Sequence, residues 1–211
     1  MERGRPRGFD EHQALDAALA VFWRNGYQGA SMTELTQAMG ISKPSLYTAF
    51  GNKEQLYLTA LERYREIQLV KHAEALAAEP DLKNAMRAFL RSVAVMLTSP
   101  DLPGGCMVVN SAVACDITSL PKHVVAAIGN TVNQSSFDLL KDRLQGELQN
   151  RQLPHGSNIQ QLADFFTTVM TGMAVIAKVG VTQERLFDTI ELALCVLPES
   201  NRKPQADNIR Q

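Results

Sequence analysis

The chain has 211 residues, of which 45% are hydrophobic and 20% charged, a balance typical of a soluble globular protein with an ample core. Its net charge of −1 excludes a uniformly basic nucleic-acid binder, so any DNA contact must depend on where the basic side chains gather. No apolar run approaches the ~20 residues that span a bilayer, and no signal-peptide pattern opens the sequence, so we expect a cytoplasmic protein. Three cysteines without a CxxC pair argue against a disulfide scaffold.

The first eight residues form a basic arm in which Arg3, Arg5 and Arg7 are separated by glycine and proline. An arm of this composition has no apolar core to join and is expected to be flexible in isolation. Arginines on a slim backbone suit the narrow minor groove of A·T-rich DNA. A solubilising tail is the alternative interpretation. We favour DNA contact, because a helix-turn-helix pattern follows the arm in the sequence.

Three short helices are predicted next, each with its own start or stop signal. The first begins at Asp10, an N-cap residue, and runs up to Gly26, which supplies a stop. Residues 31–39 open with Ser-x-x-Glu, the pattern of a capping box, and Gly40 can adopt the left-handed conformation of a tight turn. Residues 42–49 form the third helix, with proline in its first turn. Two short helices joined this tightly predict a helix-turn-helix, whose second helix can enter the major groove of DNA.

The helix over residues 42–49 has two contrasting faces. Leu46 and Phe50, four residues apart, are expected to face inward. The outward face then carries Lys43, Ser45, Tyr47 and Thr48. Small hydroxyls with one lysine and one tyrosine suit contacts with phosphates and base edges. The alternative role for the tyrosine is a core aromatic, but the inner face is already filled.

Residues 9–64 resemble the DNA-binding domain of the TetR/AcrR family of bacterial transcriptional regulators. The resemblance is carried by FWRNGYQGASM and by TELTQAMGISKPSLYTAFGNKEQL after it. It implies a DNA-binding transcriptional regulator, usually a ligand-released repressor, that binds a pseudo-palindromic operator as a dimer. It also implies DNA contacts for Thr33, Ser42, Lys43, Pro44, Ser45, Tyr47 and Lys53. The last of these would stand at a helix N-terminus, where the helix dipole already favours a phosphate.

The rest of the chain is predicted to contain helices and no strands. A helix that starts at Asn52 meets no glycine or proline until Pro80, and its length of about 37 Å is enough to join two domains. Further helices are predicted over residues 81–98, 106–114, 120–150, 158–178 and 182–197. We therefore predict an all-α protein of about nine helices. It would comprise a basic arm (1–8), a three-helix helix-turn-helix domain (9–68), a larger ligand-sensing and dimerisation domain (69–197) and a flexible tail (198–211).

The last two predicted helices are candidates for a dimer interface. The helix over residues 158–178 is apolar over more than one face, more than one core contact requires, although a merely central helix would look the same. The family resemblance implies a four-helix bundle made by these two helices and their mates. The expected interface residues are Leu162, Phe165, Phe166, Val169, Met170, Met173, Leu186, Ile190 and Leu194.

An effector pocket is implied by the resemblance among the middle helices of the second domain. Apolar walls with a few polar groups make a general small-molecule pocket, which these residue types do not narrow to one effector. The expected lining is Met86, Phe89, Leu90, Met107, Asn110, Ser111 and Phe137, with Cys106 and Lys178 beside them.

Cys106 suggests a more specific alternative. It follows two glycines at an expected helix N-terminus, where the helix dipole favours a thiolate. The run GCMVVNSAVACD, with AVIAKVG later, resembles the family branch that contains the repressor of N-ethylmaleimide reductase. That resemblance implies that Cys106 senses electrophiles or oxidants and that Lys178 traps the oxidised sulfur. A thiol that merely fills core space is the competing interpretation.

Metal sensing and enzymatic activity are less well supported by the sequence. Cys106, Cys115, Asp116 and His123 could bind a metal, but their spacing matches no compact site. No G-x-S-x-G, H-E-x-x-H, Walker A or G-x-G-x-x-G pattern is present, so we expect neither an enzyme nor a cofactor. The expected partners are double-stranded operator DNA, a small-molecule effector and a second copy of the chain, with no membrane.

Overall fold

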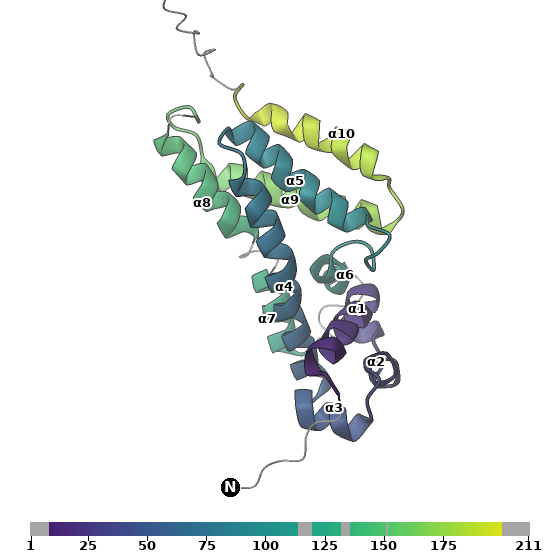
Figure 1. Cartoon of the computed structure of the whole chain (residues 1–211). Helices are drawn as coiled ribbons and strands as arrows, with labels where there is room; N and C mark the ends of the chain where they lie inside the picture. The colour runs from purple at the N-terminus through teal and green to yellow at the C-terminus, as the bar shows by residue number, and fades with distance from the viewer. Residues whose placement is uncertain (1–8, 114–119, 132–135, 151, 200–211) are drawn as a thin grey trace, which may run out of the picture.

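The computed structural model describes residues 9–113, 120–131, 136–150 and 152–199, which form ten α-helices and one short 3-10 turn, with no strand among them. The all-α prediction is therefore confirmed. The helices are α1 (Glu11–Gly29), α2 (Met32–Met39), α3 (Lys43–Phe50), α4 (Lys53–Ala77), α5 (Leu82–Thr98), α6 (Met107–Val113), α7 (Lys122–Asn130), α8 (Ser136–Gln149), α9 (Ile159–Lys178) and α10 (Gln183–Ala193). Figure 1 shows α1–α3 at one end of the molecule, hereafter the DNA-reading unit, and α5–α10, hereafter the body, joined to it by α4.

The DNA-reading unit is built around a small aromatic core. The side chain of Asp10 caps α1, as predicted, by accepting hydrogen bonds from the second and third following amides. The backbone leaves helical geometry at Gly26 (φ 69°, ψ −179°), and one further turn then carries α1 to Gly29. Phe22 is fully buried and meets the ring of Tyr57 on α4 edge-on, with ring centroids 5.1 Å apart. This contact fixes α1 across the start of α4.

The body packs its helices around α5. One face of α5 is buried and apolar, which follows the 3.6-residue period read from the sequence. That face lies against α4, α9 and α10, while α8 packs on α9. The short α6 extends from the body and contacts α1 of the DNA-reading unit (Figure 1). Buried side chains of the two regions form one continuous cluster. Every helix among the described residues is too short or too polar to span a bilayer.

Two helical stretches, α7 and α8, lie within the single helix predicted over residues 120–150. Residues 132–135 between them lie outside the described residues, so a single helix there stays a prediction. The two helices pack differently, α7 against α4 and α6, and α8 against α9.

The far end of α4 is held by one arginine of α8. Arg143 donates through Nη1 to the carbonyl of Leu76 at 2.6 Å and through Nη2 to the carbonyl of Glu79 at 2.9 Å. Its Nε donates to Glu147 Oε1 at 2.8 Å, which keeps the guanidinium in place. The arginine satisfies carbonyl groups that a helix C-terminus leaves without partners. As a result, α4 is fixed to the body at this end.

Candidate nucleic-acid interface and interior cavity

The turn between α2 and α3 is set by two serine caps and one glycine. Ser31 Oγ accepts a hydrogen bond from the Glu34 amide at 3.1 Å and begins α2. Ser42 Oγ accepts one from the Ser45 amide at 3.2 Å and begins α3. Gly40 ends α2 at φ 65° and ψ 25°, a left-handed conformation that costs other residues roughly 1 kcal/mol or more. The predicted start and stop signals of the helix-turn-helix are confirmed.

The outward face of α3 carries polar and charged groups. Leu46 is fully buried beneath the helix, and Tyr47 on the other side is 46% exposed, which rules out the core alternative for this tyrosine. Lys43 Nζ lies 6.0 Å from the centroid of the Tyr47 ring, so a cation and a phenol stand next to each other. The exposed Thr48 hydroxyl donates to the carbonyl of Pro44 at 2.9 Å and keeps its oxygen free to accept. These groups match phosphate oxygens and base edges.

The N-terminus of α4 forms a second polar site beside α3. Asn52 and Gln55 complete a capping box there. Lys53 Nζ lies 4.7 Å from the centroid of the Tyr27 ring, where the ring face attracts the ammonium group. Partial burial lowers the pKa of Lys53, while burial and the charge of Glu54 raise the pKa of Tyr27. The ammonium group is therefore held beside a helix N-terminus, a position that favours an anion.

The residues expected to contact DNA lie on α2, on α3 and at the start of α4, at the end of the molecule remote from α10 (Figure 1). Thr33, Ser42, Lys43, Pro44, Tyr47 and Thr48 are exposed, and Ser45 and Lys53 are partly exposed. Ser45 Oγ and Ser42 Oγ lie 2.8 Å apart and hydrogen-bond each other. Arg3, Arg5 and Arg7 lie outside the described residues.

A cavity of about 90 Å³ lies in the body, lined by side chains of α4, α5, α6 and α9 and by residues next to them. Of the residues expected in an effector pocket, Cys106 lines it. The structure places the others elsewhere. Met86, Phe89, Leu90 and Met107 are fully buried as core. Their side chains fill space between helices, and a cavity forms where such filling is incomplete.

The sequence interpretation missed most of the cavity lining. Tyr64, Gln68 and His72 of α4 line the cavity, and so do Thr167 and Thr171 of α9. The signal was present on α4, because Gln68 and His72 continue at four-residue intervals from Tyr64 on the buried face. Polar residues within an otherwise apolar stripe indicate either a buried network or a ligand site.

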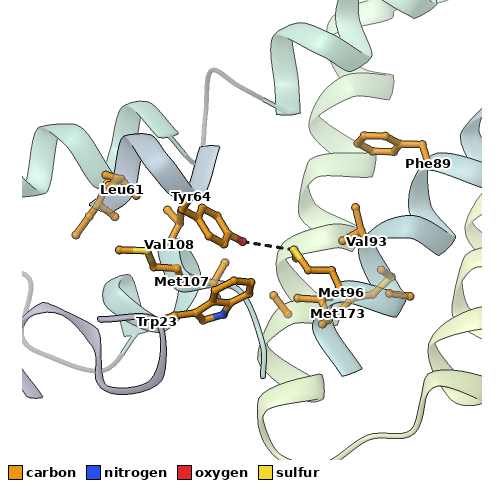
Figure 2. Close-up of a cluster of buried hydrophobic side chains, with 14 of the residues drawn as sticks. Trp23, Leu61, Tyr64, Phe89, Val93, Met96, Met107, Val108 and Met173 are labelled. Atoms are coloured by element: carbon orange, nitrogen blue, oxygen red, sulfur yellow. Dashed lines mark hydrogen bonds between the residues drawn. The ribbon is translucent and has the colours of Figure 1, made fainter. Parts of the chain in front are cut away.

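Tyr64 connects the cavity to the DNA-reading unit. Its hydroxyl donates to Cys106 Sγ at 3.2 Å and also lies 3.7 Å from Met96 Sδ, the contact drawn in Figure 2. Burial and the neighbouring thiol raise the pKa of Tyr64 well above its ordinary value, so the phenol stays protonated and donates. Its ring meets Trp23 of α1 edge-on, with centroids 4.8 Å apart. A change at the cysteine therefore reaches α1 through two side chains.

Asn110 completes this junction and is not a pocket residue. Its Nδ2 donates to the carbonyls of Trp23 at 2.9 Å and Gly104 at 3.1 Å, and Trp23 Nε1 donates to the carbonyl of Gly105 at 2.9 Å. A Cβ atom added at Gly105 would lie 2.9 Å from Asn110 Oδ1, so the chain comes close here. These bonds tie α1 to the loop before α6. The neighbouring Ser111 is fully buried.

The remaining candidate sensing residues lie apart. Lys178 is exposed and its Nζ donates to the carbonyl of Arg24 at 3.2 Å, so its bonding partner is α1 rather than the thiol. Phe137 is partly buried at the start of α8 and does not line the cavity. Within the described ranges, no three His, Cys, Asp or Glu side chains gather into a metal site. His123 Nε2 lies 2.9 Å from Glu54 Oε2, and the other two candidate ligands, Cys115 and Asp116, fall outside those ranges.

Five of the expected dimer residues pack inside the chain itself. Phe166, Met173, Leu186, Ile190 and Leu194 are almost fully buried in the single chain, because α9 and α10 turn these side chains toward α5 and each other. They cannot meet a partner directly. Leu162, Val169 and Met170 are partly buried, and Phe165 is 37% exposed. The exposed apolar residues of these helices are Phe165, Val175, Ile176, Val179 and Leu192.

Comparison with known proteins identifies the family. Residues 14–60 match the family described as bacterial regulatory proteins, tetR family. The transcriptional repressor ComR of Escherichia coli K12 is 32% identical over 202 residues, which cover 93% of each chain. The chain belongs to the TetR family. It is therefore a transcriptional regulator that binds DNA and not an enzyme, as expected from the sequence.

Further similar proteins support this result. The repressor BdcR of Escherichia coli K12 is 27% identical, over 90% of each chain. A structure of a CifR cysteine mutant bound to 26-bp double-strand operator DNA superposes with a TM-score of 0.86 at 36% identity, and covers 92% of this chain and all of that one. Reduced NemR of Escherichia coli, at 20% identity and a TM-score of 0.71, covers 88% of this chain and 93% of its own and shares the fold.

Proposed function

We propose that this TetR-family regulator is a repressor that binds operator DNA through α3 and the N-terminus of α4. The observation that carries the proposal is the outward face of α3, where Lys43, Tyr47 and Thr48 stand exposed on a helix fixed by the cap of Ser42. Lysine and hydroxyl groups bind phosphates and acceptor atoms on base edges. The relatives ComR and BdcR are repressors, and the CifR structure holds operator DNA, which supports the same role here.

A pseudo-palindromic operator requires a two-fold dimer, and we propose that this dimer forms through α9 and α10. Phe165, Val169, Ile176 and Val179 recur at intervals of four, seven and three residues along α9 and form one apolar stripe that is at least partly exposed. On α10, Leu192 is 75% exposed, which is unusual for a leucine beside an apolar surface. We propose that these residues, in place of the buried ones expected from the sequence, pair with a second copy and place two α3 helices on one side of the duplex.

The decisive test is binding of the full chain to a labelled duplex of its upstream DNA, followed by fluorescence anisotropy at fixed salt. The double variant Lys43→Ala, Tyr47→Ala should bind at least about 100-fold more weakly, because a phosphate contact and base-edge contacts are lost together. Lys71→Ala, an exposed lysine on the body half of α4, is the matched control and should bind as the wild type does. Wild-type binding no tighter than to random duplex would refute the proposal.

A second candidate function, release of DNA by an electrophile at Cys106, rests on one further observation. Cys106 lines the cavity, and its sulfur accepts the hydrogen bond of the Tyr64 hydroxyl at 3.2 Å, so a nucleophilic atom stands beside a space that a small electrophile can enter. Addition of the sulfur across the C=C bond of a maleimide would form a C–S bond, and the thiol proton would end on the neighbouring carbon. The added group would displace Tyr64 and, with it, Trp23.

Treatment with N-ethylmaleimide tests this second candidate. Operator affinity should fall in the wild type and in Cys195→Ser, because that cysteine is exposed in the short turn after α10 and does not line the cavity. It should remain unchanged in Cys106→Ser. An equal loss of affinity in the Cys106→Ser variant would exclude the cysteine as the sensor.

A further inference from the structure

The cavity has a polar end that the proposed sensing chemistry does not use. Gln68 and His72 lie one helical turn apart on α4, and both are 7% exposed. Thr167 of α9 lines the same cavity. Two helices distant in the sequence therefore bring an amide, an imidazole and a hydroxyl to one cavity.

Two of these groups lack hydrogen-bond partners. Among the described residues, none donates to or accepts from the side-chain amide of Gln68, although that side chain is more than nine-tenths buried. Thr167 Oγ1 is also buried, and no partner for it exists in the same part of the chain. An unpaired buried polar group costs about 1–3 kcal/mol. Two such groups at one cavity indicate a ligand that completes their bonding.

The third group, His72, presents an acceptor. Ser92 Oγ lies 2.7 Å from the carbonyl of Phe89, which can only accept, and 2.8 Å from His72 Nδ1. With the serine proton on that carbonyl, Nδ1 donates to Ser92 Oγ and Nε2 carries a lone pair, and this is the tautomer that we assign. Burial and the nearby charge of Lys71 lower the pKa of His72 to about 4, so the ring is neutral at physiological pH. A ligand that meets Nε2 must donate a hydrogen bond.

The remaining walls exclude a charged ligand. Of the described lining residues, only Arg65 carries a full charge, and its Nη1 is engaged by Glu62 Oε2 at 2.7 Å. The rest of the surface is largely apolar, with Leu69, Val93, Leu97 and Val109 among its residues. A cavity of roughly 150 Å³ holds the six carbons of benzene, so one of about 90 Å³ holds about four non-hydrogen atoms. The described part of the site is small and mostly apolar, and its one cation already pairs with Glu62.

We propose that this cavity binds a small uncharged molecule with a short apolar segment and a polar group that both donates and accepts hydrogen bonds, held by Gln68, His72 and Thr167. An amide or alcohol has this chemistry: its N–H or O–H donates to His72 Nε2, and its oxygen accepts from the Gln68 amide or the Thr167 hydroxyl. A role for this molecule as an effector rests on the proposed repressor function, whereas its binding to the free protein does not depend on that proposal.

Three probes of equal size separate the alternatives. Acetamide donates and accepts, acetone only accepts, and acetate is an anion, while all three have four non-hydrogen atoms and share a methyl group on a carbonyl carbon. The readout is the imidazole ¹⁵N spectrum of the full chain, in which His72 is distinct because the other three histidines, His12, His123 and His155, are exposed. Acetamide should shift the His72 Nε2 signal in a saturable way, and acetone and acetate should bind at least about tenfold more weakly.

Two variants test which groups hold the probe. Thr167→Val and Gln68→Leu should each weaken acetamide binding about tenfold. Thr167→Val should also raise the melting temperature by a few degrees, since it removes an unpaired buried hydroxyl. Thr171→Val is the matched control. That hydroxyl lies at the same cavity but already donates to the carbonyl of Thr167 at 2.9 Å, so its loss should leave binding unchanged.

Several outcomes would overturn the proposal. Acetate binding as tightly as acetamide would show that a charge is accepted, and equal binding by acetone would show that the site does not require a hydrogen-bond donor. A His72 signal that does not respond to acetamide up to its solubility limit would show that the cavity holds water only. These assays contain no DNA, so their failure leaves operator binding intact, and a failure to bind operator would leave them unaffected.

Discussion

The DNA-reading unit and the body hold their shapes by different means. In the DNA-reading unit, Ser31, Gly40 and Ser42 fix two helices through bonds that span no more than four residues. In the body and at its junction with α1, the polar contacts join distant parts of the chain, such as Arg87 with Glu191 across 104 residues and Asn110 with Trp23 across 87 residues. Local bonds make the recognition helix a preformed element. Long-range buried bonds make the body responsive to what its interior contains.

The largest expected effect is a pH dependence of the free energy of unfolding, which His72 causes. Because burial holds its folded pKa at about 4, below the ordinary 6.5, its contribution to stability is complete above pH 6.5 and is lost as the pH falls toward 4. The free energy of unfolding, measured with urea at pH 7 and pH 4, should fall by about 3 kcal/mol more in the wild type than in His72→Asn. Asparagine keeps an N–H for Ser92. The exposed His155→Asn is the control, and an identical pH profile for the wild type and His72→Asn would contradict the assignment.

A somewhat smaller loss is expected at the junction between the two regions. Asn110→Ala leaves the carbonyls of Trp23 and Gly104 without a donor, and a buried unpaired carbonyl costs about 2 kcal/mol. Urea unfolding at pH 7 should show this loss. Asn84→Ala, at an exposed asparagine of α5, should cost far less. A greater loss at Asn84 would mean that these long-range bonds do not govern the body.

The DNA-reading unit should lose less from a single broken bond. Ser42→Ala removes the cap of α3 and should lower the free energy of unfolding by about 1 kcal/mol. Ser42→Asn retains a capping oxygen and should restore most of it, which separates the cap from a DNA contact of the same hydroxyl. If Ser42→Ala cost more than Asn110→Ala, the contrast between local and long-range stabilisation would fail.

The smallest effect is expected where the two regions meet through an exposed ion pair. His123 Nε2 and Glu54 Oε2 lie 2.9 Å apart, but the histidine side chain is 54% exposed. Exposed pairs contribute little, so His123→Ala should change the free energy of unfolding by less than about 0.5 kcal/mol. A loss above 1 kcal/mol in the same urea assay would show that α7 is a real support of the DNA-reading unit.

The predictable part of the molecule was the part fixed by local chemistry. The caps at Asp10, Ser31, Ser42 and Asn52 and the turn at Gly40 all stand where sequence patterns placed them. Such signals are readable because the bonding partners lie within three or four residues. The outward face of α3 was also predicted from a local pattern, the four-residue spacing of Leu46 and Phe50 on the inner face.

The body was harder to predict because an apolar sequence pattern does not show which surface covers a buried residue. Phe166 and Leu186 were expected at a dimer interface, but a residue on an apolar stripe looks the same whether its own chain or a second copy covers it. The cavity posed a related problem. Phe89 and Gln68 are both buried, and only the packing of four helices decides that the first fills space and the second borders a gap.

The anchoring of α4 by Arg143 determines how far a small rotation in the body moves the opposite end of that helix. The bonds from Arg143 to the carbonyls of Leu76 and Glu79 make that end of α4 a fixed pivot. Since 25 residues of helix extend about 37 Å, a rotation of about 5° at the pivot moves the other end by about 3 Å. One base pair advances ~3.4 Å along the duplex axis. A displacement inside the body too small to disturb its core would thus shift a recognition helix by one step of the operator.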